Sequence, residues 1–319
     1  MTYLSVSKGA PGYPPLLAEL HDPPRRLYLR QGSTAVLELP AVAIVGARSC
    51  SPYGAQVARE LARDLAAAGM VVVSGLARGV DGEAHRGALQ AGGATVAVLG
   101  CGIDRDYPRA HSELARRIAE TGLVVSEYEP GVEPSPWRFP ARNRIIAGLA
   151  RATVVVEARE RSGALITADF ALELGREVFA VPGEITSALS AGTNDLIRQG
   201  ATPLLSAGDV LEALGVEPAP AAPAASLSSE AEAVAAFLAR GAATLDETSR
   251  ATGVGSAEVA VALTELELAG LVAGADGVYR VAGTGALRSV EDLVHDVGKD
   301  DEAQGEDGKP DAHAEADME

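Results

Sequence analysis

The sequence predicts an α/β fold in which a doubly wound, mostly parallel sheet is covered by helices on both faces. Six apolar, β-branched runs alternate with stretches of helical length, at residues 42–47, 71–76, 95–100, 123–128, 153–158 and 177–183. Runs that are apolar throughout are typical of strands buried on both faces. Strands connected through helices lie parallel to one another. These observations favour the extended Rossmann-like class.

A smaller second domain is expected after this sheet. Residues 215–226 form a Pro/Ala tract, which cannot build a packed core and is typical of a semi-rigid linker. Three helical patterns then precede a hairpin around Asp276 and Gly277, an order typical of a winged helix. We therefore expect an N-terminal extension at 1–40 with one helical stretch at 16–20, a Rossmann-like domain at 41–214, a linker at 215–227, a winged-helix-like domain at 228–282 and an acidic disordered tail at 283–319.

The composition indicates a cytoplasmic protein without membrane contact. The two cysteines, Cys50 and Cys101, lack metal-ligand spacing, so neither a disulfide framework nor a metal site is expected. No positively charged leader opens the chain, and no apolar run approaches the roughly 18 residues needed to span a bilayer. The absence of a disulfide framework agrees with a reducing compartment.

Charge is distributed unevenly along the chain. The net charge is −17, yet residues 290–319 alone hold twelve acids and two lysines, whereas residues 138–161 hold six arginines and two glutamates. Arginine makes bidentate phosphate contacts, so this local excess is compatible with a nucleic-acid partner. A lineage-wide preference for arginine over lysine explains the pattern at least as well.

Candidate ligand-binding residues follow the strands, because ligands of open α/β sheets bind outside the carboxyl ends of the strands, near helix N-termini. Gly46 and Arg48 follow the first run, and a glycine-rich turn with Arg78 follows the second. Ser162–Gly163 and Gly192–Asn194 open helices after the fifth and sixth runs. Glycine serves backbone geometry alone as often as it serves an anion site. The recurrence of such turns favours one extended anion site.

Residues 137–146, WRFPARNRII, are the richest candidate for binding single-stranded nucleic acid. Such ligands need a cationic groove for phosphates and aromatic faces on which bases stack. The segment combines Trp137 and Phe139 with Arg138, Arg142 and Arg144. Proline and glycine before it predict that Phe139 lies on a loop, available for stacking. Alternatively, both aromatic residues anchor the core and the arginines pair with Glu127, Glu129 and Glu157.

Motifs for catalysis are missing from the sequence. No GxGxxG follows the first run and no GxxxxGK[ST] occurs anywhere, which excludes the usual nucleotide-cofactor motifs. Asp81, Glu83 and His85 have a spacing that imitates a metal cluster, but a residue two positions on points to another face of a helix. His85 is expected to be a packed or hydrogen-bonded structural residue. We expect no catalytic residue, cofactor or metal ion.

Ordered motifs cover about residues 13–214. They are VGAR at 45–48, SGLARGVDGEAH at 74–85, GCGIDRDYP at 100–108, SEYEPG at 126–131, FPARNRIIAGLA at 139–150, VVEARERSGALITADFALELGREVFAVPG at 155–183 and GTNDLIRQGA at 192–201. In these motifs the chain resembles the DprA/Smf (DNA processing protein A) family.

The resemblance implies a protein that binds single-stranded DNA without hydrolysing it. It further implies a homodimer formed through the Rossmann-like domain, and delivery of the RecA recombinase onto DNA in natural transformation and recombination. Together with the turns described above, it gives the expected DNA-binding residues: Gly46, Arg48, Arg78, Arg138, Phe139, Arg142, Arg144, Ser162, Gly163 and Asn194.

The chain is expected to depart from the family in two respects, and two alternative functions are open. Many members begin with a helical SAM-like domain, for which the first forty residues leave no room. The winged-helix-like domain carries eight acids and three arginines, so we expect it to contact protein rather than DNA. One alternative is a nucleotide phosphoribohydrolase-like Rossmann enzyme, whose PGGxGTxxE segment is missing here. The other is an interaction adaptor whose arginines are all paired.

Overall fold

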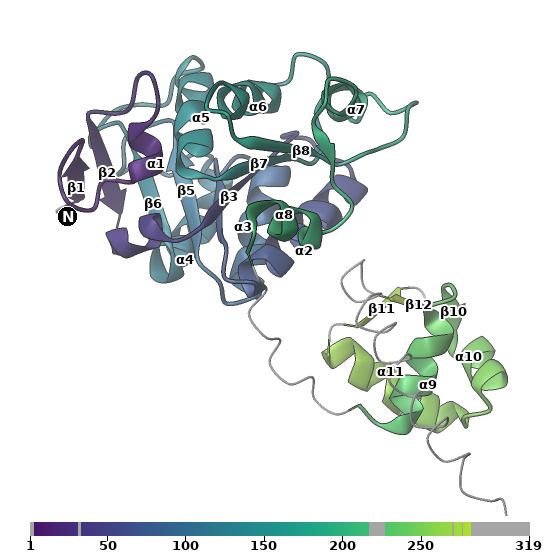
Figure 1. The fold of residues 1–319 in the computed structure, drawn as a ribbon. Coiled ribbons are helices and arrows are strands. Elements are labelled where there is room, and N and C mark those ends of the chain that lie inside the picture. Colours follow the sequence, from purple (N-terminus) through teal and green to yellow (C-terminus); the bar gives the residue numbers. More distant parts are fainter. Residues whose placement is uncertain (1–2, 31–32, 217–226, 270, 276, 282–319) are drawn as a thin grey trace, which may run out of the picture. The chain divides into compact units, whose positions relative to one another are not determined.

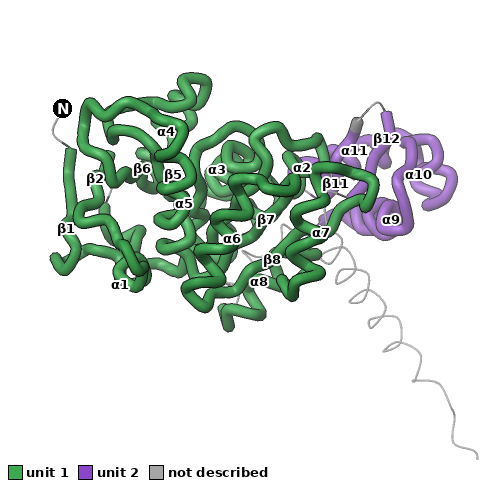
Figure 2. Tube along the Cα trace, turned by 90° about the horizontal axis from the view of Figure 1, so that it is seen from above, with its two compact units in different colours: residues 1–221 green, residues 222–319 purple. Residues whose placement is uncertain are grey.

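The structure is a computed structural model that describes residues 3–30, 33–216, 227–269, 271–275 and 277–281 (Figure 1). The chain divides into two compact units, residues 1–221 and 222–319 (Figure 2). Three expectations fall outside the described residues: most of the linker, at 217–226, the acidic tail at 283–319, and Asp276 in the hairpin. No helix in the described part of the chain is long and apolar enough to cross a bilayer.

The first unit is built on a nine-stranded sheet of order β1-β2-β6-β5-β4-β3-β7-β8-β9. Its strands are β1 (Leu4–Ser7), β2 (Arg26–Arg30), β3 (Ala41–Val45), β4 (Val71–Ser74), β5 (Thr95–Leu99), β6 (Leu123–Ser126), β7 (Ala152–Val155), β8 (Glu177–Ala180) and β9 (Thr202–Pro203). The strands from β6 to β9 in this order run parallel, whereas β2 runs antiparallel to both of its neighbours, β6 and β1. The order reverses at β3, which lies between β4 and β7. The predicted doubly wound α/β class is confirmed.

Helices cover both faces of this sheet (Figure 1). They are α1 (Pro15–Ala18), α2 (Pro52–Ala67), α3 (Val80–Gln90), α4 (Ser112–Thr121), α5 (Arg138–Leu149), α6 (Gly163–Glu173), α7 (Ala191–Arg198) and α8 (Ala207–Leu214), with short 3₁₀ helices η1 (Thr34–Glu38) and η2 (Arg109–His111). Helices α1, α5, α6 and α7 contribute to one core, and α2, α3 and α8 contribute to another.

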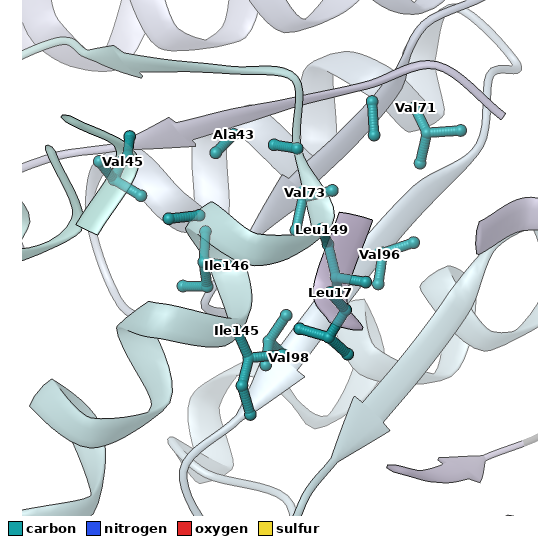
Figure 3. Close-up of a cluster of buried hydrophobic side chains, with 14 of the residues drawn as sticks. Leu17, Ala43, Val45, Val71, Val73, Val96, Val98, Ile145, Ile146 and Leu149 are labelled. Atoms are coloured by element: carbon teal, nitrogen blue, oxygen red, sulfur yellow. The ribbon is translucent and has the colours of Figure 1, made fainter. Parts of the chain in front are cut away.

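Strand β3 shows why its sequence is apolar at every position. Ala43 and Val45 point into the core to which Ile145 and Ile146 of α5 also belong (Figure 3). Ile44 belongs to the core on the other face. Successive side chains of a strand point to opposite faces, so a strand between two helix layers has no polar side.

The first forty residues contain more regular structure than the one expected helical stretch at 16–20. They contribute strands β1 and β2, which extend the sheet beyond β6. These strands lack a continuous apolar run because they lie near the edge of the sheet. In β2 only Leu27 and Leu29 are buried, Tyr28 and Arg30 are partly accessible and Arg26 is exposed. Alternation over five residues was too weak a signal to indicate a strand.

The second unit confirms the predicted winged helix. Helices α9 (Ser229–Leu238), α10 (Leu245–Thr252) and α11 (Ser256–Leu268) surround a separate core, followed by the hairpin β11 (Val272–Ala275) and β12 (Val278–Val281). A short strand β10 (Ala243–Thr244) completes a sheet of order β10-β12-β11. Local signals define the helix ends: Thr244 and Glu247 form a reciprocal capping box at the start of α10, and Gly253 ends it with φ +73°.

Candidate nucleic-acid interface

Two adjoining pockets lie at the carboxyl ends of the central strands, where the strand order reverses. Their volumes are about 970 and 230 Å³, and both are lined by Arg48, Ala77, Phe139 and Arg142. We call the two pockets together the groove. Open α/β sheets place their ligand sites at such a reversal point.

The turns after β3 and β4 pack tightly against each other, and this packing requires glycine. A Cβ atom on Gly46 would lie 2.6 Å from Cγ2 of Val80, and one on Gly79, where φ is +71°, would overlap the carbonyl oxygen of Ala47. The backbone N–H of Val80 donates to that same oxygen at 3.2 Å. Gly46 therefore has a steric role in addition to its place in the wall of the smaller pocket.

Protein carboxylates already occupy two of the turns that were expected to bind an anion. At the start of α2, the N–H and hydroxyl of Ser51 donate to buried Glu157 at 2.9 and 2.5 Å. After β4, the N–H groups of Gly75 and Ala77 donate to Asp81 at 3.1 and 3.3 Å. A phosphate would have to displace these carboxylates, so neither set of donors is open to a ligand.

Asn194 has a similar internal role. Its side chain accepts from the N–H of Gly183 at 3.2 Å and donates to the carbonyl oxygen of Gly183 at 3.0 Å, which closes the turn after β8. Asn194 does not line the groove. Its expected contact with DNA remains a prediction that this geometry does not favour.

The N-terminus of α6 faces the smaller pocket. Ser162 caps it by accepting from the N–H of Ala164 at 3.3 Å, and a Cβ atom on Gly163 would meet nothing within 4 Å. One turn later, the buried hydroxyl of Thr167 makes no hydrogen bond to any described residue, although it lines the same pocket. A helix N-terminus with an unpaired donor beside it is suited to an anion.

Three exposed arginines supply the uncompensated charge of the groove. Arg48, Arg78 and Arg109 line it and make no ion pair within the described part of the chain. The acids of the larger pocket are paired instead: Arg105 lies 2.8 Å from Glu133 and 3.7 Å from Asp104, and Asp106 pairs with Arg30 of β2. The groove therefore attracts anions despite the acidic chain.

Arg142 lies beneath the groove rather than at its rim. Its side chain is buried, and Nη1 donates to the carbonyl oxygens of Gly75, at 2.7 Å, and of Val98. Burial lowers the pKa of Arg142 to about 10 and raises the pKa of nearby Asp81, while each charge partly offsets the shift of the other. Arg142 thus connects α5 to the ends of β4 and β5, which is not the exposed phosphate contact expected from the sequence.

Arg144 and Arg138 also point away from the groove. Arg144 forms an ion pair with Glu127 at 2.6 Å, in which both side chains are about 15% exposed. The guanidinium of Arg138 lies 5.0 Å from the ring centroids of Tyr128 and Trp137. The alternative that the arginines pair with glutamates of the protein holds for Arg144. The alternative that Trp137 anchors the core does not hold, because its side chain is 61% exposed.

Phe139 lies in the first turn of α5, so the prediction that it lies on a loop is wrong. The Pro/Gly-rich segment ends immediately before the helix, and Pro140 is tolerated because the N–H groups of a first turn have no helical acceptor. The ring contacts Tyr107, with centroids 5.1 Å apart and planes 27° apart, and Cζ of Arg48 lies 5.3 Å from its centroid. Phe139 does line the groove.

Sequence reasoning missed Tyr107 and Arg109. Both come from the segment after β5, and both line the larger pocket. The motif GCGIDRDYP at 100–108 was recognised only as a family resemblance. An available signal was its place at the carboxyl end of a central strand, the criterion that selected Arg48 and Arg78.

His85 is confirmed as a buried, hydrogen-bonded residue. Its Nδ1 lies 2.7 Å from Oγ1 of Thr95, and that hydroxyl donates to the carbonyl oxygen of Val72 at 2.6 Å. The Nδ1 atom therefore carries the proton. Burial lowers the pKa of His85 to about 3. Within the described residues, no group of three His, Cys, Asp or Glu side chains is placed to hold a metal ion.

The fold and the groove together define a class: an extended Rossmann-like domain with an anion-attracting groove at the reversal of its strand order, followed by a winged helix. The family model for DNA recombination-mediator protein A matches residues 5–215, and the model for the DprA winged helix domain matches residues 217–277. The chain belongs to the DprA/Smf family of DNA processing proteins.

Curated relatives support this membership. The chain is 48% identical over 199 residues to DNA processing protein DprA of Streptococcus pneumoniae, covering 62% of this chain and 70% of that protein. It is 41% identical over 278 residues to protein Smf of Escherichia coli, covering 84% and 74%. Identity to a putative DNA processing protein DprA of Mycobacterium tuberculosis is 47% over 254 residues; the match covers 77% of this chain but only 65% of that relative's length.

Two solved structures share the fold. DprA of Streptococcus pneumoniae gives a TM-score of 0.63 at 46% identity, covering 66% of this chain and 74% of that one. DNA processing protein A of Helicobacter pylori, whose structure is described as revealing a single-stranded DNA binding mode, gives 0.61 at 33% identity, covering 67% and 95%.

Proposed function

We propose that this protein binds single-stranded DNA in the groove. The observation that carries the proposal is the set of three exposed arginines, Arg48, Arg78 and Arg109, which line one hollow and make no ion pair among the described residues. The single-stranded DNA binding mode described for the Helicobacter pylori relative supports the same ligand.

The groove offers two kinds of phosphate contact. The arginines supply charged, bidentate donors, and the N-terminus of α6 supplies neutral N–H groups together with the hydroxyl of Thr167. We assign the expected DNA-binding residues to two groups. Those that face the ligand are Gly46, Arg48, Arg78, Phe139, Ser162 and Gly163; Arg142 supports the groove from beneath, and Arg138, Arg144 and Asn194 act only through the fold around it.

A fluorescence-anisotropy titration with an oligothymidine and with a duplex, each over a range of salt concentrations, tests this function. Each phosphate contact contributes about −0.7 to the slope of log affinity against log salt for a single strand. Replacing Arg48 and Arg78 by alanine should lower affinity by at least about tenfold and flatten the slope. Arg151→Ala is the matched control, because Arg151 is exposed directly before β7, at the opposite edge of the sheet. An unchanged slope in the double variant would contradict the proposal.

We further propose the wider roles that the family resemblance implies. The domain at 41–214 carries the DNA and forms a homodimer, and the complex delivers the RecA recombinase onto single strands in natural transformation and recombination. These steps place the protein in the cytoplasm. The acidic charge of the winged-helix domain at 228–282, rather than the resemblance, leads us to propose that this domain contacts protein. Light scattering would measure the dimer, and the rate at which RecA assembles on a single strand, with and without this protein, would measure delivery.

We propose no catalytic step for this site. The helix start that would carry the PGG segment of a phosphoribohydrolase reads Arg161-Ser162-Gly163-Ala164, and here it forms the open end of α6. Release of free base from a nucleoside monophosphate, followed by chromatography, would overturn this assignment.

A further inference from the structure

The larger pocket contains an aromatic ring whose role the phosphate contacts leave unexplained. Tyr107 lies in the segment between β5 and η2, lines the larger pocket and is 44% exposed. An exposed tyrosine ring in a hollow has apolar surface that is free to contact a ligand.

Phe139, the aromatic residue expected to stack on bases, is already in contact with the protein on several sides. Tyr107 stacks on its ring, and the guanidinium of Arg48 lies over it. A Cβ atom on Gly100 would lie 2.8 Å from Cδ1 of Phe139, so the ring edge also packs against the backbone after β5. Of the two stacked rings, Tyr107 is the more exposed.

The segment that carries Tyr107 is held at both ends. On one side, Arg30 of β2 donates to the carbonyl oxygens of Ile103, at 2.6 and 3.0 Å, and of Arg105, at 3.0 Å, and pairs with Asp106. On the other side, Nδ1 of buried His111 lies 3.0 Å from the carbonyl oxygen of Leu76. A ring fixed in place before binding loses little conformational entropy when a ligand stacks on it.

The pocket in front of Tyr107 is large and cationic. Its volume of about 970 Å³ lies at the upper end of the range typical for small-molecule sites, so it has room for an unstacked base with its sugar and phosphate. Arg78 and Arg109 line the same pocket. The ring is therefore placed for a base whose own phosphates contact these arginines.

We propose that Tyr107, supported from behind by Phe139, is the platform on which an unpaired base of the bound strand stacks. This inference rests on the proposed function and goes further, because it makes the groove selective for strands whose bases are unstacked. A base within a duplex has both faces covered by its neighbours, so it has no face to offer the ring.

The test compares an oligothymidine with an abasic oligomer of equal length, which has the same phosphates and no bases. The wild-type protein should bind the oligothymidine more tightly by about 5- to 150-fold, the usual contribution of one stacked base. Tyr107→Leu should lose this preference and still bind the abasic oligomer as the wild type does. Tyr107→Phe should keep it. Tyr53→Leu, the matched control at an exposed tyrosine outside the groove, should keep it too.

The outcomes separate this inference from the proposed function. If the wild type binds both oligomers equally, with a steep salt dependence, the platform is wrong and the phosphate groove stands. If Tyr107→Leu retains the preference and Phe139→Leu loses it, Phe139 is the platform and the inference is overturned. If Tyr107→Leu weakens binding of both oligomers equally, Tyr107 only shapes the groove, which also overturns it. If the wild type binds neither oligomer, the proposed function fails and the inference fails with it.

Discussion

The groove of the first unit and helix α11 of the second differ in how their exposed charges are balanced. The groove presents Arg48, Arg78 and Arg109 without carboxylate partners. Helix α11 occupies the place of a recognition helix in a winged-helix fold, yet SAEVAVALTELEL contains three glutamates and no basic residue. A helix that enters a DNA groove needs cations against the phosphates. The Rossmann-like domain therefore has the charges expected of a DNA-binding site, whereas helix α11 of the winged helix does not.

The groove also depends on two buried opposite charges, Arg142 and Asp81, and removing one of them gives the largest expected effect. Arg142→Met removes the cation beneath the groove and leaves the buried Asp81 carboxylate with only the backbone N–H groups of Gly75 and Ala77 as donors among the described residues. Removing one member of a buried pair costs about 3–5 kcal/mol. We therefore expect the free energy of unfolding of the first unit to fall by that amount. Trp137, the single tryptophan, reports on this unit in a urea titration followed by fluorescence.

Two controls accompany this measurement. Arg151→Met removes an exposed arginine from the same unit and should change the free energy of unfolding by less than about 0.5 kcal/mol. Arg142→Met combined with Asp81→Asn removes both charges and should recover part of the loss. A loss below about 1 kcal/mol in Arg142→Met would show that these two buried charges do not hold the groove together.

The different places of Arg142 and Arg48 illustrate what the sequence predicts and what it leaves open. Arg142 precedes Ile145, Ile146 and Leu149 at the spacing of one helix face, so the pattern that puts these residues in the core also puts Arg142 at its edge. That signal was present but was outweighed by the cluster of arginines. Arg48 was selected because it follows a central strand, and the structure places it in the groove.

Other features depend on contacts that no local pattern contains. The six apolar runs predicted β3 to β8, since burial on both faces leaves a continuous signal. The strands β1 and β2, at one end of the sheet, are partly exposed and gave no such signal. Likewise, the carboxylate that accepts from Ser51 at the N-terminus of α2 belongs to Glu157, which is more than a hundred positions away along the chain. Spacing along the chain cannot show that an expected anion site is already occupied.

The two units should also differ in their response to acid. The pKa of His85 is about 3 in the folded protein and about 6.5 when unfolded. A folded pKa below the unfolded value gives stability that is complete above pH 6.5 and is lost as the pH falls from 6.5 towards 3. At pH 5.5 this single group should lower the free energy of unfolding of the first unit by about 1.4 kcal/mol. Residues 227–281 contain no histidine, so the second unit lacks this term.

His85→Asn tests the assignment, because the asparagine amide can donate to Thr95 in place of Nδ1 and does not titrate. Urea titrations followed by Trp137 fluorescence at pH 7.5 and 5.5 should show a smaller difference between the two pH values in the variant than in the wild type. An identical difference in both proteins would mean that His85 does not carry the acid sensitivity. The second unit, followed by its own far-ultraviolet signal in an isolated fragment, should not show this loss.

The smallest expected effect concerns the arginines of the winged helix. Arg250 and Arg280 are exposed, but residues 228–282 hold eight acids against three arginines, so a phosphate brought to this surface meets net repulsion. Replacing both by alanine should change the affinity for an oligothymidine by less than twofold and leave the salt slope unchanged. If either arginine contacted a phosphate, its removal would flatten that slope by about 0.7, as expected for Arg48. The Arg48 and Arg78 double variant, titrated in the same salt series, shows how large a change the method resolves. A flattened slope in the winged-helix variant would place DNA on both units and remove the contrast between them.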